Sequence, residues 1–569
     1  MRKLLLLLMA CLLVLTGCSG IPERSDPVVV GPAPAPGDEA DQGNGIQPGG
    51  PDRDASSDAI VRGFIKALTA TDTTYAVARE FLTPEVAKSW TPSEEVTIIE
   101  PSNVANPGVE EGSVQFAATR VAKVDVRGVY HVDSGAIDYD FELVQVAGQW
   151  RITNPPAELI IDQNSFGSLY KDASIYFADP SGGRLVPDVR YFRTNPQQRA
   201  NRLIQALIDG PVGTLTDGVR NELGGAAKLR SAVNHRQDPI TIDLSGLGQK
   251  TEAQLRVASA QIMWTLQDLG VQTARITNDG EPLDIAGVGE TQEISDWADF
   301  DPNHLPFNAT AYYIDGGAVL TDTAEKVPGP AGTGEYSITE AAVSINGTRI
   351  AAVSAGSTPP VLRTGAINEQ LSVIDLPGTT SLSAPTWGPS SEEFWIVRNG
   401  SEIMRVSAKG APKIVSTQGL TDVGQIRRIA LSRDGVRLAV LAGQPGGPGR
   451  LYLATVQSSA DSVSLLQPVP LAPNLDVSAV VWRDARTLAV LGRPTTPGSV
   501  LPFTLLIDNS SLSVLPAPVL SGETLAIAAA PDRPFLCSIN QNILRLQDSA
   551  WVSLVGGIAV TGSRPFYPG

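Results

Sequence analysis

The pattern of apolar positions predicts helices and then a sheet in the first ordered part of the chain. Apolar residues recur at helical spacing over 60–68, with Ser57 as the predicted N-cap, and Thr83-Pro84 carries the signal of another helix start. Over 137–143, apolar residues alternate with acidic ones, as in an antiparallel strand with one buried face. This order predicts an α+β domain at about 55–165, similar in pattern to the NTF2-like or cystatin-like shape.

A second stretch, at about 170–285, alternates strand and helix patterns. Two strand patterns flank a polar turn near its start. Two amphipathic helix patterns follow, the first stopped by Gly210-Pro211 and the second by Gly270. These signals predict a second α+β domain, followed by a linker at 286–306.

From about 307 the chain carries strand patterns with almost no helical spacing, and one phrase of strand, tight polar turn and strand recurs. The copies are centred on Ser344, Trp387, Ser432, Trp482 and Ala530, at steps of 43, 45, 50 and 48 residues. A period of about 40–50 residues made only of strands predicts a β-propeller of about six blades over 307–569, with a pair of β-sandwiches as the alternative. We expect a strand near Tyr312 and Tyr313 to complete the last blade, because an open ring would leave two unpaired strand edges.

The start of the chain has the order of a bacterial lipoprotein signal. Arg2-Lys3 precedes an apolar run that reaches Leu15, which is too short to span a bilayer as an anchor. Leu15-Thr16-Gly17-Cys18 then looks like a lipobox, with a small residue before the cut and a cysteine after it. The cysteine sulfur is the group able to take a diacylglyceryl chain as a thioether.

We therefore predict a signal peptide at 1–17, cut after Gly17, with a diacylglyceryl thioether and an N-acyl chain on Cys18. The lipid would anchor the protein to the cell membrane on its extracytoplasmic face. An ordinary secretory signal with a chance cysteine is the alternative. Residues 18–54 are the lipidated cysteine and a tether rich in proline and glycine, a composition that cannot bury a core.

Charge narrows the choice of partner. The 569-residue chain has a formal net charge of −17 at pH 7, and removal of Arg2 and Lys3 with the signal peptide takes away two positive charges and leaves about −19. An acidic protein repels phosphate backbones and anionic lipid surfaces, so nucleic acid is not an expected partner. The membrane is expected to be reached through the lipid anchor alone.

The thiol chemistry is predicted to be structural. The chain has three cysteines; Cys11 leaves with the signal peptide and Cys18 carries the lipid. Cys537 remains alone in the apolar run Phe535-Leu536-Cys537, which predicts a buried thiol rather than a reactive one.

No catalytic residue, metal site or cofactor is predicted. His131, His235 and His304 are far apart in sequence and form no zinc-binding motif. Ser168-Leu169-Tyr170-Lys171 matches the Ser-x-x-Lys of penicillin-binding enzymes, but the accompanying Ser-Asp-Asn and Lys-Thr-Gly motifs do not follow. The protein is therefore expected not to be an enzyme.

Two tryptophans of the repeated phrase could serve either binding or packing. Trp387 and Trp482 could line a groove for a sugar or a peptide. Their matched positions in two copies of the phrase favour packing between blades. The sequence thus leaves the binding residues unknown.

The second domain resembles the GerMN domain of spore-germination proteins and lipoproteins. The resemblance rests on four phrases: 176–179, 185–187, the helix end Leu207-Ile208-Asp209-Gly210-Pro211, and Ile242-Asp243-Leu244-Ser245. Together with the lipobox, the tether, the first α+β domain and the propeller pattern, the order of domains resembles the actinobacterial lipoprotein LpqB family.

This resemblance implies a function that composition and spacing do not show. The family is encoded beside the Mtr two-component system and is thought to bind the extracellular sensor domain of the membrane histidine kinase MtrB. It would thereby affect cell-wall homeostasis and cell division. Two other functions remain open: binding of cell-wall glycan or a small ligand in the propeller channel, and an unrecognised wall hydrolase built on paired carboxylates.

The lipobox leads to a prediction about processing. In a Cys18→Ala variant the sulfur that takes the diacylglyceryl group is missing, so we expect an unlipidated and poorly processed precursor. Mass spectrometry of the membrane fraction measures this. A mature wild-type N-terminus other than Cys18, or no acyl mass on Cys18, would contradict it.

Overall fold

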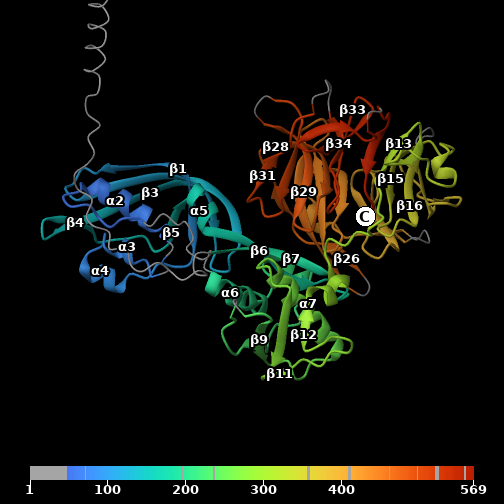
Figure 1. Ribbon diagram of the computed structural model, residues 1–569. Coiled ribbons are helices and arrows are strands. Elements are labelled where there is room, and N and C mark those ends of the chain that lie inside the picture. The colour runs from blue at the N-terminus through green and yellow to red at the C-terminus, as the bar shows by residue number, and fades with distance from the viewer. Residues whose placement is uncertain are drawn as a thin grey trace, which may run out of the picture. The chain divides into compact units, whose positions relative to one another are not determined.

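The structure is a computed structural model in which the described residues start at Pro48 (Figure 1). It describes residues 48–569 apart from 71, 73, 194–195, 235–236, 355–358, 408–411, 460–461, 496–497, 519–523 and 557–558. The predicted signal peptide with Gly17, the predicted lipidation site Cys18 and most of the predicted tether lie outside the described residues. Among the described residues, no helix has both the length and the apolar character needed to cross a membrane.

The first domain is an α+β unit with one five-stranded sheet in the order β4-β3-β2-β1-β5. The strands are β1 (Val96–Pro107), β2 (Ser113–Val124), β3 (Tyr130–Val146), β4 (Gln149–Ile152) and β5 (Leu159–Asp162). The helices are α2 (Ser57–Ala67), α3 (Ala76–Arg79), α4 (Pro84–Ser89) and α5 (Gln163–Leu169). Neighbouring strands are antiparallel except that β5 runs parallel to β1.

The apolar face of α2 packs on this sheet, as the helical spacing predicts. Phe64 is fully buried, with its ring centroid 6.2 Å from that of Phe141 on β3. The N-cap is Ser56 rather than the predicted Ser57, and its side chain makes no capping hydrogen bond. The predicted tether extends too far, because Asp54 and Gln149 exchange two hydrogen bonds of 2.8 Å that hold this segment on the domain.

The second domain starts with a two-stranded ribbon of β6 (Tyr170–Ala178) and β7 (Leu185–Arg193). Two helices, α6 (Pro196–Asp209) and α7 (Glu252–Gln267), and a short 3-10 helix η1 (Gly213–Asp217) follow. A separate sheet holds β8 (Lys228–Leu229), β9 (Ile240–Ser245), β10 (Thr273–Asn278), β11 (Glu281–Pro282) and β12 (Thr291–Glu293). Both predicted helices of this domain are present, and α7 starts with a capping box of Thr251 and Gln254.

The predicted linker at 286–306 is wrong for its central part. Strand β12 pairs with β10, and the 3-10 helix η2 (Ile294–Phe300) places Trp297 in the core of the second domain, where it is fully buried. Trp264 of α7 donates its indole N–H to the Trp297 carbonyl at 3.1 Å. The segment around Trp297 is mostly polar, so its sequence resembles that of a linker. Only the burial of Trp297 in the folded protein shows that the segment is docked on the second domain.

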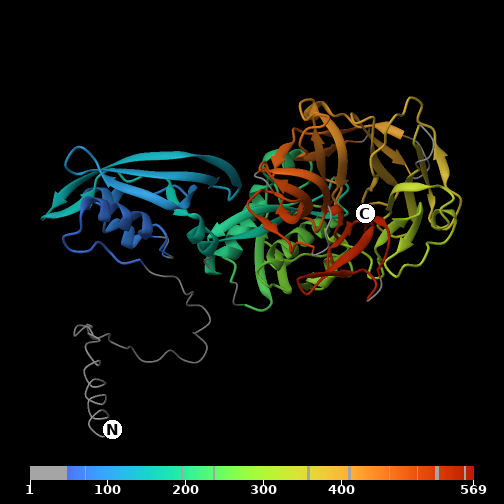
Figure 2. The same ribbon diagram turned by 90° about the horizontal axis from the view of Figure 1, so that it is seen from above.

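The rest of the chain forms six sheets that follow one another around a ring (Figure 2). The first sheet holds β13 (Tyr312–Asp315), β14 (Ala318–Thr321) and β36 (Ser563–Phe566), and the second holds β15 (Ile338–Val343), β16 (Arg349–Ser354), β17 (Val361–Ala366) and β18 (Ser372–Ile374). The third holds β19 (Thr386–Trp387), β20 (Glu393–Arg398), β21 (Glu402–Ser407) and β22 (Pro412–Ile414).

The fourth sheet holds β23 (Gln425–Leu431), β24 (Arg437–Gly443), β25 (Arg450–Ser458), β26 (Val463–Leu465) and β27 (Val469–Leu471). The fifth holds β28 (Leu475–Trp482), β29 (Thr487–Pro494), β30 (Leu501–Leu506) and β31 (Leu512–Val514), and the sixth holds β32 (Thr524–Ala528), β33 (Leu536–Ile539), β34 (Asn542–Gln547) and β35 (Ala550–Ser553). Short 3-10 helices η3 (Pro330–Gly332) and η4 (Gln418–Leu420) lie in connections.

These sheets form the predicted propeller, and the alternative of two β-sandwiches is wrong. The first strands of successive sheets contact one another from β15 to β32, and β36 contacts both β32 and β33. The ring closes where β36 pairs with β13, with Tyr312 opposite Phe566. The predicted completion of the last blade is confirmed: β36 is the inner strand of that blade, and the N-terminal strand of Tyr312 pairs with it, followed by β14.

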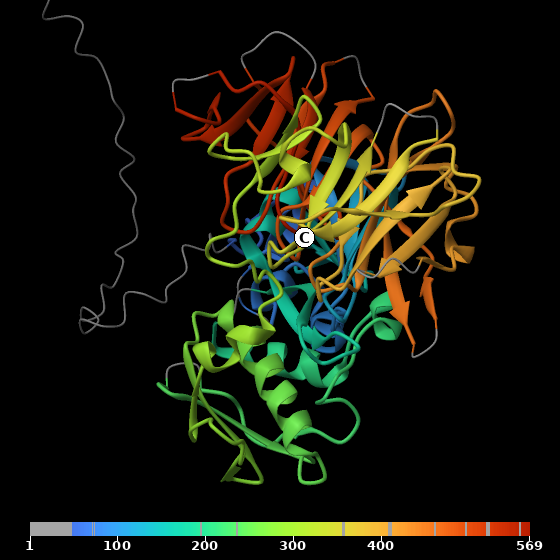
Figure 3. The ribbon, with the colours of Figure 1, turned by 90° about the vertical axis from the view of Figure 1, so that its right-hand side faces the viewer.

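The ribbon of β6 and β7 joins the three domains. Tyr170 packs in the core of the first domain, Phe177 in that of the second, and Val189 in a core cluster of the propeller. Figure 3 shows the second domain, in green, against the propeller sheets, in yellow to red. One ribbon therefore sets how all three cores are placed.

Ring closure leads to a stability prediction. Tyr312 is buried and its ring stacks on Phe566 at 5.5 Å between centroids, so Tyr312→Ala leaves a cavity at the closing seam. We expect the free energy of unfolding to fall by about 3 kcal/mol in chemical denaturation of the propeller transition. Phe307→Ala is the matched control, because Phe307 is 96% exposed and its loss should change the free energy by less than about 0.5 kcal/mol. Equal effects of the two variants would contradict closure by this pair.

Candidate functional site: the propeller channel and its two ends

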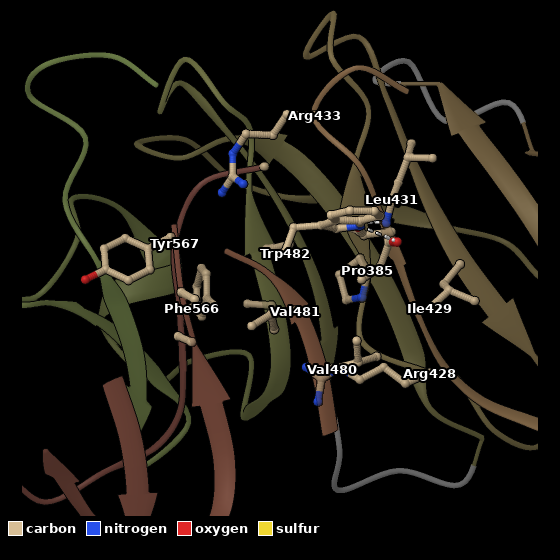
Figure 4. A pocket seen from close by; sticks show the side chains of 17 residues that line it. Pro385, Arg428, Ile429, Leu431, Arg433, Val480, Val481, Trp482, Phe566 and Tyr567 are labelled. Carbon is tan, nitrogen blue, oxygen red and sulfur yellow. Dashed lines mark hydrogen bonds between the residues drawn. The ribbon is translucent and has the colours of Figure 1, made fainter. Parts of the chain in front are cut away.

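The first strands of the propeller sheets line a narrow central channel (Figure 4). Its middle has a volume of about 80 Å³, which is too small for a drug-sized ligand. The walls are mostly small or apolar: Ala341, Ala342, Thr386, Ala430, Leu431, Val480, Val481, Ala528 and Ala529. A drug-sized ligand of this region must therefore bind at an end of the channel rather than in its middle.

The two tryptophans of the repeated phrase join neighbouring sheets. Trp387 donates its indole N–H to the Ala342 carbonyl and Trp482 donates to the Ala430 carbonyl, each at 2.9 Å and each to the first strand of the preceding sheet. They are 1% and 5% exposed. The predicted packing role is confirmed, because both side chains lie in the cores between neighbouring sheets and use their indole N–H groups to bond those sheets together.

Residues of the chain's own C-terminal segment close one end of the channel. The Gly569 amide donates to the Val343 carbonyl at 3.0 Å, and Arg433 donates to the Pro568 carbonyl at 3.4 Å. Tyr567 donates its hydroxyl to the Pro534 carbonyl at 2.8 Å. Burial lowers the pKa of Arg433 to about 10, which the nearby Asp484 carboxylate opposes. This end is therefore filled by protein.

The opposite end opens into a cavity of about 460 Å³ with a charged lining. Its charged residues are Glu340, Arg427, Arg428, Asp476, Arg493 and Arg564. Figure 4 shows Arg428 at this end and Arg433 at the other. Four guanidinium groups against two carboxylates make this a positively charged site in an acidic protein.

A third cavity, of about 570 Å³, lies between the second domain and the propeller. Its polar groups are already used to join the two domains: Arg486 donates to Asp172 at 2.9 Å and to Ser174 at 3.1 Å, and Asp268 accepts the Ser174 amide at 2.9 Å. Burial raises the pKa of Asp301 in the same cavity. These contacts describe a domain seam rather than a pairing of nucleophile and base.

The structure does not bring the two described histidines together. His131 is exposed, with its Nε2 3.1 Å from Asp125 Oδ2, and His304 is exposed on another domain, whereas His235 lies outside the described residues. Within the described ranges, no group of three or more His, Cys, Asp or Glu side chains is placed to hold a metal ion.

The serine and the lysine of the Ser-x-x-Lys match do not contact each other through their polar groups but make separate local hydrogen bonds. Ser168, on α5, donates to the Asn164 carbonyl at 3.1 Å, and Lys171 donates to the Gly167 carbonyl at 2.8 Å. Both side chains are exposed. Each polar group therefore bonds to a backbone carbonyl of α5, Ser168 from the helix itself and Lys171 from the following strand β6.

Sequence reasoning missed the charged end of the channel. Arg428 lies four residues before Ser432, and Glu340 lies four residues before Ser344, the matching turn residue of another copy. Alignment of the copies at these turns was the signal that could have found them. That alignment centres the second copy on Gly388 rather than on Trp387, because the Gly388 amide donates to the Glu393 carbonyl as the Ser344 amide does to the Arg349 carbonyl.

Comparison with protein-family models gives three matches. Residues 50–167 match the N-terminal domain of lipoprotein LpqB, and residues 174–284 match the Germane family, described as sporulation and spore germination. Residues 318–568 match the lipoprotein LpqB β-propeller domain. The three matches cover each of the domains described above.

Curated relatives are similar over nearly the whole chain. Lipoprotein LpqB of Mycolicibacterium smegmatis is 30% identical and that of Rhodococcus opacus 27%; the alignments cover 100% and 93% of this chain and 100% and 91% of the relatives. Among solved structures, TolB of Acinetobacter baumannii is 14% identical with a TM-score of 0.32, over 46% of this chain and 66% of that protein. A likeness this low carries no functional argument.

The buried thiol leads to a prediction about reactivity. Cys537 is fully buried on β33, and burial raises the pKa of its thiol to about 12. In the lipid-free chain with Cys18→Ala, we expect no reaction of the native protein with a disulfide reagent at pH 8, and titration of Cys537 once the protein is unfolded, because the thiolate is the reacting form. Rapid reaction of the folded protein would contradict it.

The same shift has a consequence for stability. The pKa of Cys537 in the folded protein lies above the unfolded value of about 8.5. The contribution of its neutral thiol to the stability of the folded protein is therefore complete below that pH. It is lost as the pH rises from there toward 12.

Proposed function

The chain belongs to the lipoprotein LpqB family, and from that premise we propose that it acts on the extracytoplasmic face of the membrane as a binding protein for the MtrB-type sensor kinase. Its lipid on Cys18 would hold it at the surface where such a sensor domain is exposed. Binding would modulate the two-component system and, through it, cell-wall homeostasis and cell division. The proposed contact region is the second domain and the propeller.

The observation that carries this proposal is the continuous framework of three domains. Arg437 of the propeller is buried and donates to the Pro187 carbonyl of β7, and Tyr191 of β7 donates its hydroxyl to Ser510 at 2.6 Å. Thr214 and Thr455 share a further hydrogen bond of 2.8 Å. Domains joined in this way present one preorganised surface, which lowers the cost of ordering on binding.

The net charge of the chain indicates what kind of partner surface it would bind. The net charge of −17 favours a partner surface with positive charge, because complementary charges speed association. Salt screens this attraction and shortens its range to about 8 Å at physiological ionic strength. Association should therefore slow as the salt concentration rises.

The cavity at the open end of the channel favours a second candidate function. Its volume of about 460 Å³ and its four arginines suit a small ligand or a glycan that carries negative charge. In this alternative the protein binds cell-wall material rather than a kinase.

A binding titration tests the first candidate against the second. The full mature chain with Cys18→Ala is titrated with the purified sensor domain at low and at physiological salt, beside purified peptidoglycan fragments. We expect binding to the sensor domain that associates more slowly at the higher salt. Binding to the fragments with none to the sensor would replace the proposal by the second candidate, and release of cleaved fragments would indicate a hydrolase.

Matched charge reversals locate the contact region. Glu281 and Asp284 are exposed on the second domain, and Glu110 and Glu111 are exposed on the first. Glu281→Lys with Asp284→Lys should slow association more than Glu110→Lys with Glu111→Lys, although both pairs change the charge equally. A larger effect of the first-domain pair would contradict the proposed contact region.

A further inference from the structure

We propose that the open end of the propeller channel is a binding site for one small anionic group, a phosphate or a carboxylate, held by Arg428 with Arg564 beside it. This site makes the second candidate function specific, and it does not depend on the proposed contact with the kinase. It rests on the placement of the charged residues around the channel, on their partners, and on the space before them.

The first strands of the sheets deliver one layer of residues to this end of the channel. Four of these strands carry a β-bulge, and the residue after each bulge is Glu340, Arg428, Ala479 or Ala526. A bulge adds a residue to one strand and so re-aims the side chains near it. The recurring bulge therefore places two charged side chains in one ring with small alanines.

The small neighbours leave room in front of the charges. Ala384 lines the cavity beside Glu340 and Arg428, and the cavity volume is about 460 Å³. Behind this layer the channel narrows to about 80 Å³. A ligand can therefore place one anionic group against the ring while the rest of it stays outside the channel.

The charges of this layer are not balanced. Arg564 Nε lies 2.9 Å from Glu340 Oε1, which pairs one cation with the one carboxylate of the layer. Across the described ranges, we find no hydrogen-bond or ion-pair partner for the Arg428 guanidinium. Arg428 thus lines the cavity as a second cation, and the one carboxylate near it, that of Glu340, is already paired with Arg564.

The neighbouring Arg427 and Asp476 side chains bond to backbone groups rather than to Arg428. Arg427 donates to the carbonyls of Gln444 and Gly447, each at 2.8 Å, and the Asp476 carboxylate accepts the Gly449 amide at 2.7 Å. Burial lowers the pKa of Arg428, an effect that Glu340 opposes and Arg564 reinforces. Arginine nevertheless stays protonated near neutral pH, so the unbalanced charge persists and attracts an anion.

The chemistry of guanidinium defines the ligand class. Its planar N–H groups match the paired oxygens of a carboxylate or a phosphate and form charge-assisted hydrogen bonds with them. Both groups share this recognition, so the experiment must separate them. Inorganic phosphate and succinate serve as the two probes.

Calorimetric titration of the full mature chain with Cys18→Ala tests the site. We expect at least one probe to bind with one site per chain at millimolar concentration or below. Arg428→Gln removes the charge and should weaken binding roughly tenfold or more, since hydrogen bonds to charged groups carry that weight. Arg53→Gln is the matched control, because Arg53 is exposed on the first domain, and it should leave binding unchanged.

A second variant separates a lost site from a damaged fold. Glu340→Gln removes the carboxylate that pairs with Arg564, so we expect binding to become several-fold tighter. Damage to the propeller would weaken binding in both variants and cannot produce this opposite change. Binding of phosphate alone or of succinate alone would assign the source of the anion.

Three results would overturn the proposal. The first is that neither probe binds the unmodified site, and the second is that Arg428→Gln binds as tightly as the unmodified chain. The third is that Glu340→Gln weakens binding while its unfolding temperature is unchanged.

Discussion

Strand β7 carries the contacts on which the arrangement of the three domains depends. The Tyr191 amide donates to the Gly128 carbonyl of the first domain at 2.7 Å, and the Tyr191 hydroxyl donates to Ser510 of the propeller at 2.6 Å. Between these contacts, Arg190 is 1% exposed, pairs with Asp188 at 2.7 Å and donates to the Gly210 carbonyl at 2.9 Å. A buried ion pair contributes little net stability, but removal of one partner is costly, so it favours one arrangement over its competitors.

The propeller adds a second constraint, which is closure. Pairing of β36 with β13 removes the two sheet edges that an open ring would expose, and it brings the C-terminal residues into one end of the channel. The two ends thereby become different: one is filled by Tyr567 and Gly569, and the other keeps a cavity lined by arginines. The asymmetry follows from where the ring is closed rather than from the repeat itself.

The functions proposed for this molecule depend on its surfaces and on one end of a channel. The polar groups of the seam between the second domain and the propeller hold the domains together, as Arg486 and Asp172 show at 2.9 Å. A propeller fold by itself does not define an activity, because the same fold supports many. The features that distinguish this chain are its acidic surface and the contrasting positive charge at the open end of the channel.

The sequence by itself determined the local elements and their order. Helical spacing predicts α2, and the recurring strand phrase predicts a propeller of about six sheets, because periodicity reports which face of an element is buried. Tertiary structure alone decided three things: that Trp297 docks on the second domain, that the C-terminal residues close one end of the channel, and that Arg428 faces the channel near Glu340. The physical reason is that docking, closure and charge pairing depend on residues far apart in the chain, whose proximity no local pattern records.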